Sequence, residues 1–546
     1  MLALDAIRKI AGEQPGLVAV IHDGVEITYL VFWNDIVRAA GGISGKLGPG
    51  KAAVGVAMRD DYAQFVAVLA VQSLGYSPVL FNTLARPLAS GDAVPDMRGA
   101  QRIGQLRLAR IRQMCEAGAI ACVVTDGYGQ AASLSSAACR YVKLSIRPGE
   151  VAADGGDEAS SRADPGADPL AGFHALAPDA RLHVDVAFGA RGVPRFIPRS
   201  RMQFEHWVDA FSRAIPKTRR ARYLVVHDAL HGERFARVMS AWARADQVIF
   251  ERRLGMAEAV SLHHPDEFSV TASALQRLLR LLPAHCQLGN QPQVEVLGGA
   301  LSVRLQREAI RRLRCELIGS WVAPGSGAFA HAFGVDPGDE WCDRFRLVDW
   351  ARVEIVDESG EVLPENHEGW VRLLAQHLPD RCWGPEGRRR VLRDGWLYTG
   401  DRGALLPERV LQIVAHAGLV SHLDGVRLYH PTIEEALLQI PGVLDAAVFV
   451  ASSADGGNGG KGGEGGEGGE DLQRLHAAVV PIRGMRSLVR QRLNVWLADQ
   501  GSHLRRPRIL LVGFIPRGSS GMVQRGELLA SVAANSGSSL SVEEVN

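Results

Sequence analysis

The sequence predicts an α/β fold, with a large N-terminal domain of parallel-rich sheets flanked by helices and a small mobile α+β C-terminal domain. Two observations carry this prediction. Short β-branched runs alternate with longer helical patterns through most of the chain, an order that is typical of parallel sheets covered by helices. After residue 405 the pattern changes to short strands and helices over about 140 residues, a normal domain size. We therefore expect domains at 1–405 and 406–546.

The alternation is clearest in the first quarter of the chain. "AAVGVAMRD" (52–60) has the composition of a strand, "DYAQFVAVLAVQSLG" (61–75) that of a helix, and "YSPVLFN" (76–82) that of a second strand. The helical "GQLRLARIRQMCEAG" (104–118) and the strand-like "AIACVVTDG" (119–127) repeat this order. Strand, helix and strand at this spacing favour a parallel sheet.

The C-terminal domain is predicted from its own short elements. Strands are expected in "RVLQIVAHAG" (409–418), "DAAVFVA" (445–451) and "LHAAVVPI" (475–482), and helices in "PTIEEALLQIP" (431–441) and "MRSLVRQRLNVWLADQG" (485–501). Their mixed order is that of an α+β unit.

Two segments have almost nothing to bury. Residues 148–169 are acidic and rich in glycine, alanine and proline, a composition typical of a disordered insertion. Residues 456–470, "GGNGGKGGEGGEGGE", have the composition of a flexible loop. Because loop closure costs little more as a loop lengthens, this second segment is expected to join two strands of the C-terminal domain.

Composition excludes several classes of function. Lys+Arg is 61 and Asp+Glu is 60, so the formal charge of +1 provides no long-range field for nucleic acid or an anionic membrane. The seven cysteines show neither a zinc-site spacing nor a disulfide framework. Since no apolar run is long enough to cross a bilayer and the first residues do not form a signal sequence, we expect a soluble cytoplasmic protein without a metal.

Four segments follow one another in a distinctive order: "AFGARGVPRFIPRS" (187–200), "LGGA" (297–300), "YTGDRG" (398–403) and "IPRGSSGMVQRGEL" (515–528). In this order they resemble the motifs of the adenylate-forming enzymes, the AMP-dependent synthetase and ligase superfamily, which includes acyl-CoA synthetases and aryl-acid ligases. The resemblance extends over most of the chain. It implies the two-domain fold of that family, but a fold does not by itself carry chemistry.

The resemblance implies a phosphate loop at residues 187–200, where the family has a pattern such as TSGTTGxPKG. Gly189 and Gly192 match its glycines, which let backbone amides approach phosphate, and Arg195 places a cation in the lysine position. The hydroxyl-bearing positions are occupied by Ala187, Phe188, Ala190 and Arg191. The alternative is a glycine turn between two elements that binds no ligand.

The resemblance also implies contacts to the rest of a nucleotide and to an acyl group. Further nucleotide-binding positions are Gly298, Gly299, Gly319 and Asp401, with Asp401 accepting hydrogen bonds from a ribose; the alternative for Asp401 is a turn aspartate at a strand end. The substrate pocket is expected to be lined by His227, Ala300 and Trp321. The family's YGxTE motif reads Ile318 to Val322 here, and an aliphatic residue replaces the glutamate that would hold Mg²⁺.

The last segment resembles the family's PRTxSGKxxR loop, whose lysine stabilises the charge that develops during adenylation. Met522 stands in the lysine position, and a thioether is only a weak acceptor. Loss of one preorganised donor of this kind costs about 3 kcal/mol, on the order of 10²-fold to 10³-fold in rate. No catalytic residue is therefore assigned.

The sequence leaves two main hypotheses for function. The first is a degenerate member of the family with impaired ATP-dependent adenylation, retained to bind an acyl group, a nucleotide or a protein partner. The alternative is an active carboxylic acid–thiol ligase that works through an acyl adenylate. A third hypothesis is thiol transfer from a supplied adenylate. The resemblance implies ATP or AMP and coenzyme A or phosphopantetheine as cofactors, and a small carboxylic acid and an acyl carrier protein as partners.

Overall fold

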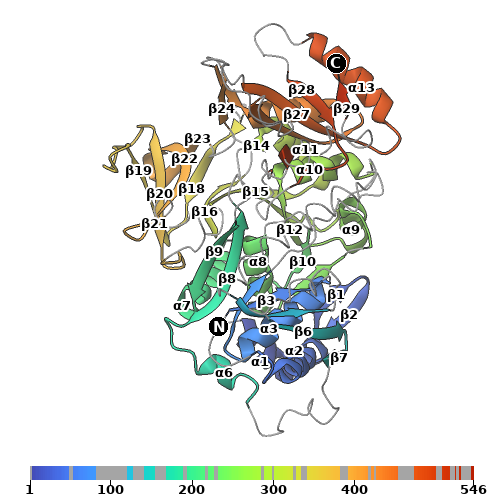
Figure 1. The fold of residues 1–546 in the computed structure, drawn as a ribbon, viewed down its shortest axis with the longest axis vertical. Coiled ribbons are helices and arrows are strands. Elements are labelled where there is room, and N and C mark those ends of the chain that lie inside the picture. Colours follow the sequence, from blue (N-terminus) through green and yellow to red (C-terminus); the bar gives the residue numbers. More distant parts are fainter. Residues whose placement is uncertain are drawn as a thin grey trace, which may run out of the picture.

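The computed structural model places two large sheets in the lower and middle parts of the molecule and a smaller third sheet at the top (Figure 1). The structure describes residues 3–47, 53–58, 60–80, 120–126, 140–153, 168–188, 194–214, 219–226, 231–251, 253–283, 288–297, 301–323, 327–333, 341–380, 392–415, 420–423, 426–452, 473–499, 507–516, 523, 528–529 and 543–545. The predicted helix at 104–118 lies outside these residues.

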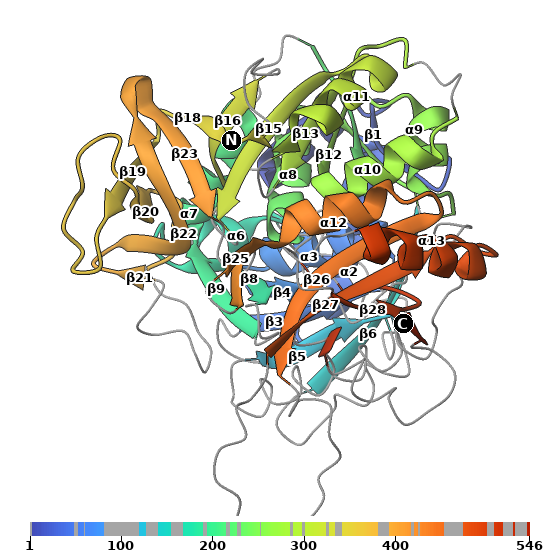
Figure 2. The same ribbon diagram turned by 90° about the horizontal axis from the view of Figure 1, so that it is seen from above.

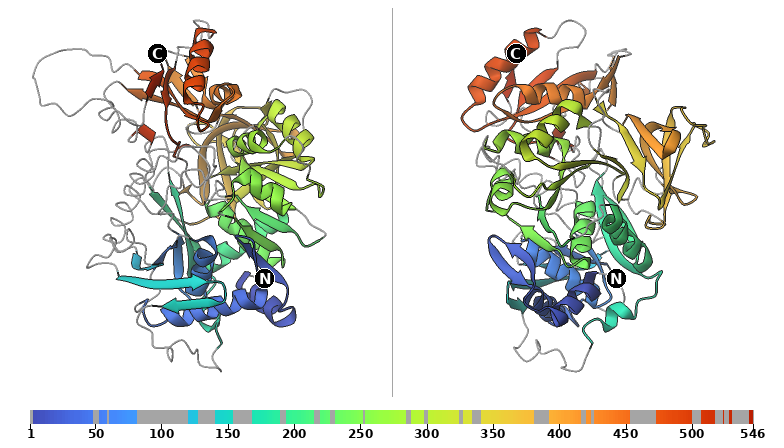
Figure 3. Two further views of the ribbon diagram at one scale, coloured as in Figure 1. Left: turned by 90° about the vertical axis from the view of Figure 1, so that its right-hand side faces the viewer. Right: turned by 180° about the vertical axis from the view of Figure 1, so that it is seen from behind.

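The larger sheet has 14 strands, in the order β19-β20-β22-β23-β18-β16-β15-β13-β12-β10-β11-β1-β2, with β21 beside β22. One half of it is mostly parallel and consists of β1 (Val18–His22), β2 (Val25–Thr28), β10 (Arg222–Val225), β11 (Gln247–Phe250), β12 (Glu267–Thr271), β13 (Gln293–Leu297) and β15 (Glu316–Ala323). The other half, which we call the lobe, is antiparallel and consists of β16 (Gly327–Phe333), β18 (Arg344–Leu347), β19 (Ala351–Val356), β20 (Gly369–Ala375), β21 (Leu392–Arg393), β22 (Trp396–Leu406) and β23 (Val410–Ala415). The lobe projects from one side of the molecule (Figure 3).

The second sheet has seven strands in the order β7-β6-β5-β3-β4-β8-β9. Its members are β3 (Ala53–Ala57), β4 (Ser77–Leu80), β5 (Ile120–Thr125), β6 (Arg140–Arg147), β7 (Glu150–Ala153), β8 (Arg181–Phe188) and β9 (Pro194–Ser200). Strand β3 is parallel to β4 and to β5, which confirms the parallel sheet predicted from the alternation.

Eleven helices are present among the described residues. They are α1 (Ala3–Glu13), α2 (Tyr29–Ile43), α3 (Asp61–Ser73), α6 (Ala171–His174), α7 (Arg201–Ala214), α8 (His231–Ala243), α9 (Met256–His263), α10 (Ala272–Leu281), α11 (Val303–Leu313), α12 (His430–Gln439) and α13 (Arg486–Asp499). Side chains of Thr28, Asp60, Thr271 and Ser302 accept backbone N–H groups at the starts of α2, α3, α10 and α11, the usual way in which a helix N-terminus is satisfied. None of the described helices is long and apolar enough to cross a membrane.

Helix α8 packs against strands of both large sheets. Its Phe235 and Trp242 join Phe65 and Phe250 in an aromatic cluster with ring centroids 5.3–5.4 Å apart at three contacts. Leu275, on the buried side of α10, belongs to a separate core that lies on the other face of the parallel half. The fold class predicted from the sequence, α/β with helices on sheets, is therefore confirmed.

The smaller sheet at the top contains β26 (Val443–Ser452), β27 (Gln473–Pro481), β28 (Arg508–Leu511) and β29 (Glu543–Val545). It is preceded by the hairpin of β24 (Val420–Leu423) and β25 (Val426–Tyr429). We call the elements from β24 to β29 the C-terminal unit. Strands β26 and β27 pair antiparallel on either side of residues 456–470, as predicted for that loop, whose own residues lie outside the described ranges.

The domain boundary predicted at 405/406 stays a prediction. Strand β23, which follows it, pairs with β22 and β18 within the large sheet. The predicted insertion at 148–169 needs a correction at both ends, because Glu150–Ala153 form β7 and pair with β6 and the Asp168 carboxylate accepts a hydrogen bond from Arg8 at 2.7 Å. Gly149, with φ 81°, makes the turn between β6 and β7, and its N–H donates to Asp35 at 2.9 Å. Residues 154–167 lie outside the described ranges.

The outer edge of β19 is partly covered. The backbone N–H of Leu363 donates to Ile355 O at 2.8 Å, and Nη2 of Arg409 donates to Ala351 O at 3.4 Å and to Val348 O at 2.9 Å. Two of the carbonyl oxygens along this edge are thus already hydrogen-bonded within the chain.

Replacing Gly172 by alanine is expected to lower the thermal unfolding midpoint. A Cβ atom on Gly172 would lie 2.6 Å from the carbonyl carbon of Leu74, and one on Gly75 would lie 2.6 Å from Gly172 O. Because backbone atoms cannot rotate away as a side chain can, α3 and α6 would have to separate, at a cost of about 1–3 kcal/mol. In the control Gly12→Ala in α1, the new Cβ meets nothing within 4 Å, so the midpoint should be unchanged or higher. An unchanged midpoint for Gly172→Ala would contradict this close contact.

Candidate functional site

Two of the predicted site residues meet in the described structure. Asp401 lies in β22 with 6% of its surface exposed, and Trp321 lies in β15 with 0% exposed. Nε1 of the Trp321 indole donates to Oδ2 of Asp401 at 3.1 Å. The hydrogen bond joins the parallel half of the large sheet to the lobe, between residues 80 positions apart in the chain.

The backbone around Asp401 is held in place by its neighbours. The N–H of Asp401 donates to Oγ1 of Thr399 at 3.0 Å, and this hydroxyl donates to Val371 O at 3.1 Å. Between them Gly400 adopts φ 81°, a conformation that favours glycine. At Gly403 an added Cβ would lie 2.5 Å from Gln412 O. The sequence "TGDRG" therefore fixes a sharp local path that directs the Asp401 carboxylate toward β15.

Successive side chains of β15 point to opposite faces of the sheet, as in any strand. Trp321 packs into the core of the lobe. Val322, on the opposite face, packs with Leu297 into the core shared with α8. Gly319 is half-buried and pairs with Val296 of β13 and Ala332 of β16. The position where the resemblance implies a magnesium carboxylate is thus held by an aliphatic side chain within an apolar cluster.

The other predicted site residues are placed less completely. Arg195 is the second residue of β9, and its backbone pairs with Ala187 of β8. The remaining predictions lie outside the described residues; they are Gly189, Gly192, His227, Gly298, Gly299, Ala300 and Met522. They stay predictions.

A buried ionic network lies next to Trp321, on the face of the sheet that carries Val322. Arg237 of α8 donates to Glu295 of β13 through Nε at 3.0 Å and Nη2 at 2.5 Å. Ser269 and Ser320 each donate a hydroxyl to Glu295, at 2.8 and 2.7 Å. All four side chains are buried. Because a buried charge is stable only when paired and hydrogen-bonded, this network holds α8, β12, β13 and β15 in one register.

Tyr223 of β10 extends this network. Its hydroxyl donates to Oγ of Ser269 at 3.4 Å. Burial raises the pKa of Tyr223 above its usual value, with smaller effects from Ser269 and nearby charges. The phenol therefore stays protonated and serves as a donor.

A second buried network joins the strands on either side of residues 189–193. Oδ1 of Asp185 in β8 lies 3.2 Å from Nε2 of His183, and Oδ2 lies 3.2 Å from Nη2 of Arg199 in β9. The Arg199 guanidinium lies 4.1 Å from the centroid of the Trp207 ring and donates to His377 O at 3.3 Å. The hairpin that flanks the predicted phosphate loop is thus tied together by buried charges.

Sequence reasoning missed both networks. A signal for the first was present, because Glu295 interrupts the apolar strand "QVEVL" and Arg237 interrupts the helix "RFARVMSAW". Charged residues are almost never fully buried unless they are paired. The pairing itself needs the fold, since Arg237 and Glu295 are 58 residues apart.

No group of three or more His, Cys, Asp or Glu side chains in the described part of the chain is arranged to hold a metal ion. At position 322, where the resemblance implies a magnesium ligand, Val322 offers no oxygen atom.

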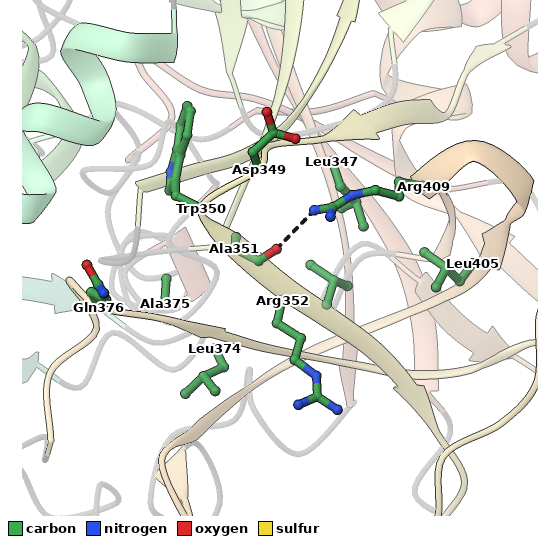
Figure 4. A pocket seen from close by; sticks show the side chains of 11 residues that line it. Leu347, Asp349, Trp350, Ala351, Arg352, Leu374, Ala375, Gln376, Leu405 and Arg409 are labelled. Carbon is green, nitrogen blue, oxygen red and sulfur yellow. Dashed lines mark hydrogen bonds between the residues drawn. The ribbon is translucent and has the colours of Figure 1, made fainter.

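A separate cavity of about 740 Å³ lies on the lobe (Figure 4). Its walls are mostly apolar and include Trp350, Leu374 and Leu405. Arg409 extends along one side toward Ala351 O, and Arg352 lies on another. None of the predicted site residues lines this cavity.

Comparison with known proteins decides the family. The family model described as AMP-binding enzyme matches residues 7–373, which is more than half of the chain. The chain belongs to the AMP-binding enzyme family. Among the relatives of this chain, 4-coumarate–CoA ligase 1 of Glycine max is 27% identical over 192 residues, which cover 34% of this chain and 59% of that ligase. Triostin synthetase I of Streptomyces triostinicus is 26% identical over 452 residues, covering 79% of this chain and 78% of the synthetase.

Solved structures show the same fold as this chain. The o-succinylbenzoate CoA synthetase MenE of Bacillus subtilis, in complex with an acyl-adenylate intermediate, superposes with a TM-score of 0.68 at 15% identity, covering 96% of this chain and 97% of that one. The match to the family model confirms the predicted family membership, and the likeness to this solved structure confirms the predicted fold.

Proposed function

We propose that this chain is a degenerate member of its family in which ATP-dependent adenylation is impaired, retained to bind an acyl group, a nucleotide or a protein partner. The observation that carries this proposal is the hydrogen bond from the Trp321 indole to Asp401. Asp401 is the residue that the family resemblance assigns to the ribose.

A ribose would have to compete with the chain itself for that carboxylate. The indole N–H already donates to Oδ2, and Asp401 is almost completely buried. A hydrogen bond to a charged group contributes about 1.5–3 kcal/mol. Displacing the indole would also leave its N–H buried without this acceptor, which adds a desolvation penalty. These costs weaken nucleotide binding through the family's ribose contact.

Two further residues that differ from the family motifs also impair adenylation. Val322 cannot ligate the magnesium that accompanies ATP, and Met522 cannot donate to a developing negative charge. Because groups that act as one unit do not contribute additively, the combined loss need not equal the sum of the separate losses. The absence of several of these groups is best explained if the protein has a function other than fast adenylation.

The alternative function is an active acid–thiol ligase working through an acyl adenylate, with coenzyme A or a carrier-protein thiol as acceptor. It is favoured by the intact segment Thr399 to Asp401 and by Arg195, which keeps a cation beside the glycine segment. Relatives named as CoA ligases support this class of substrate.

ATP–pyrophosphate exchange with a panel of carboxylic acids separates the two functions. We expect no acid-dependent exchange from the purified native chain, even at high protein concentration. Robust acid-dependent exchange would contradict the proposed impairment and favour the active ligase.

The variant Trp321→Phe tests the role of the indole directly. It removes the N–H that occupies Asp401 while keeping an aromatic ring in the core of the lobe. We expect AMP to bind about 10-fold or more tightly than to the native chain, because the carboxylate no longer has to release a donor. Isothermal titration calorimetry measures this affinity, and Trp396→Phe, which changes a half-buried tryptophan at the start of β22 that stacks with Arg352 and Arg372, is the control. Equal AMP affinity in Trp321→Phe and the native chain would contradict the claim that the indole N–H competes with a ribose for the Asp401 carboxylate.

A further inference from the structure

The cavity on the lobe is separate from the predicted site, none of whose residues lines it. Seen from above, β19 and β20, which form two of its walls, lie at the outer edge of the molecule, apart from the strands of the C-terminal unit (Figure 2). Its volume of about 740 Å³ lies in the range of about 300–1,000 Å³ that is typical of small-molecule sites. The cavity is therefore large enough for a ligand of its own.

The side chain of Arg409 brings an unpaired positive charge to this cavity. The backbone of Arg409 has φ 60°, in the left-handed region that residues with a side chain rarely adopt. Its Nη2 donates to Val348 O at 2.9 Å and to Ala351 O at 3.4 Å. Among the described residues no carboxylate forms an ion pair with it. The two backbone carbonyls thus hold the guanidinium in place without neutralising it.

The side chain of Asp349 brings an unpaired negative charge to the same cavity. Asp349 lies in the turn between β18 and β19, and the two carbonyls that accept from Arg409 lie on either side of it in the chain. Figure 4 shows its carboxylate at the upper rim, between Trp350 and Arg409. The Asp349 side chain nevertheless pairs neither with Arg409 nor with any other side chain in the described ranges.

Arg352, the third charged side chain of the lining, is already neutralised. Its Nη2 lies 2.5 Å from Oε1 of Glu354, and its guanidinium lies 5.3 Å from the centroid of the Trp396 ring. Much of the remaining wall is apolar and includes Trp350, Leu374 and Leu405. The lining therefore offers one positive group, one negative group and an apolar surface.

These two free charges select among classes of ligand. A simple anion would meet Asp349 and a simple amine would meet Arg409, and like charges repel each other. An uncharged apolar ligand would remove water from both side chains without replacing it, which is unfavourable for a charged group. A ligand with both a carboxylate and an ammonium group pairs with both side chains, and such charge-assisted hydrogen bonds are the strong ones.

We propose that the cavity on the lobe binds an α-amino acid with an apolar side chain. The ligand carboxylate pairs with Arg409, its ammonium group pairs with Asp349, and its side chain lies against the apolar wall. This site is additional to the nucleotide and acyl positions that the family resemblance implies. The inference does not depend on the proposed function, because the lobe has the same lining whether or not the chain adenylates an acid.

Isothermal titration calorimetry of the full chain with related probes tests the proposal. L-phenylalanine carries both charges, whereas 3-phenylpropanoate lacks the ammonium group and 2-phenylethylamine lacks the carboxylate. We expect L-phenylalanine to bind about 10-fold or more tightly than either analogue, because each analogue leaves one charge of the cavity unpaired. The proposal is overturned if neither L-phenylalanine nor L-leucine binds at millimolar concentration, or if either analogue binds as tightly as L-phenylalanine.

The variant Asp349→Asn distinguishes this cavity from any other place on the chain that binds phenylalanine. Without the carboxylate, L-phenylalanine should bind about 10-fold or more weakly than to the native chain, and 3-phenylpropanoate should bind more tightly than to the native chain. The control Asp394→Asn changes an exposed aspartate of the lobe that does not line the cavity and should keep the native preference. An unchanged preference in Asp349→Asn overturns the proposal.

Amide hydrogen exchange of the native chain, followed by mass spectrometry, locates the ligand without any variant. L-phenylalanine should slow exchange in the turns at residues 348–350 and 407–409, which carry Asp349 and Arg409. Neither turn contains a residue that the family resemblance assigns to the acyl pocket, so protection there identifies the cavity on the lobe. Unchanged exchange in both turns at a saturating concentration of L-phenylalanine overturns the proposal.

Discussion

The variant Glu295→Ala is expected to lower the free energy of unfolding by about 3–5 kcal/mol. Glu295 lies between Arg237, Ser269 and Ser320, and all of these side chains are buried. Without the carboxylate, the Arg237 guanidinium loses two charge-assisted hydrogen bonds but stays in an apolar region, beside the Phe211 ring at 4.8 Å. The shift of the urea unfolding midpoint, followed by tryptophan fluorescence, measures this loss.

Two further variants separate the ionic effect from simple truncation. Glu316→Ala removes an exposed glutamate from the neighbouring strand β15, where it accepts from Gln293, and should shift the midpoint little. The double variant Glu295→Ala with Arg237→Met should recover part of the loss, because it removes the buried positive charge. A midpoint for Glu295→Ala equal to that of Glu316→Ala would refute the stabilising role of the network.

The variant Asp185→Ala is the second change for which a large effect is expected, about 3 kcal/mol or more in the free energy of unfolding. The Asp185 carboxylate contacts both His183 and Arg199, which are fully buried. Arg199 would keep its carbonyl partner, His377, but would lose its nearest carboxylate. Because β8 and β9 flank residues 189–193, the loosened hairpin should also exchange backbone amide hydrogens faster, as measured by mass spectrometry.

An exposed aspartate close to β8 provides the comparison. Asp179 precedes this strand and faces solvent, so Asp179→Ala should leave both the stability and the exchange rates of β8 and β9 as they are in the native chain. If Asp185→Ala behaves like this control, the buried charges do not hold the hairpin together.

Much of the fold could be predicted because it follows from local patterns. The apolar strand at β3, the helix α3 capped by Asp60 and the strand β4 each carry their own periodicity and boundary signals. The order of strands could not be predicted in the same way. The pairing of β10 with both β11 and β12 depends on packing between residues far apart in the chain.

The candidate site also combines a feature that the sequence could predict with one that needed the fold. The family resemblance implies a magnesium ligand at position 322, and its loss could be predicted from the sequence, since no fold gives the aliphatic Val322 side chain an oxygen atom. The partner of Asp401 could not, because Trp321 is 80 residues away and the contact forms only when the lobe joins the parallel half. Trp321 was assigned to a substrate pocket, and its complete burial in the core of the lobe became visible only in the assembled fold.

The covered edge of β19 has a consequence for how this protein behaves in concentrated solution. An end strand with open carbonyl and amide groups can recruit a strand from another molecule and start aggregation. Here Leu363 and Arg409 already occupy Ile355 O and Ala351 O, so an incoming strand would meet few acceptors in register. The lobe should therefore resist intermolecular β-pairing at this end, even though its outer surface exposes Trp370 and Leu374.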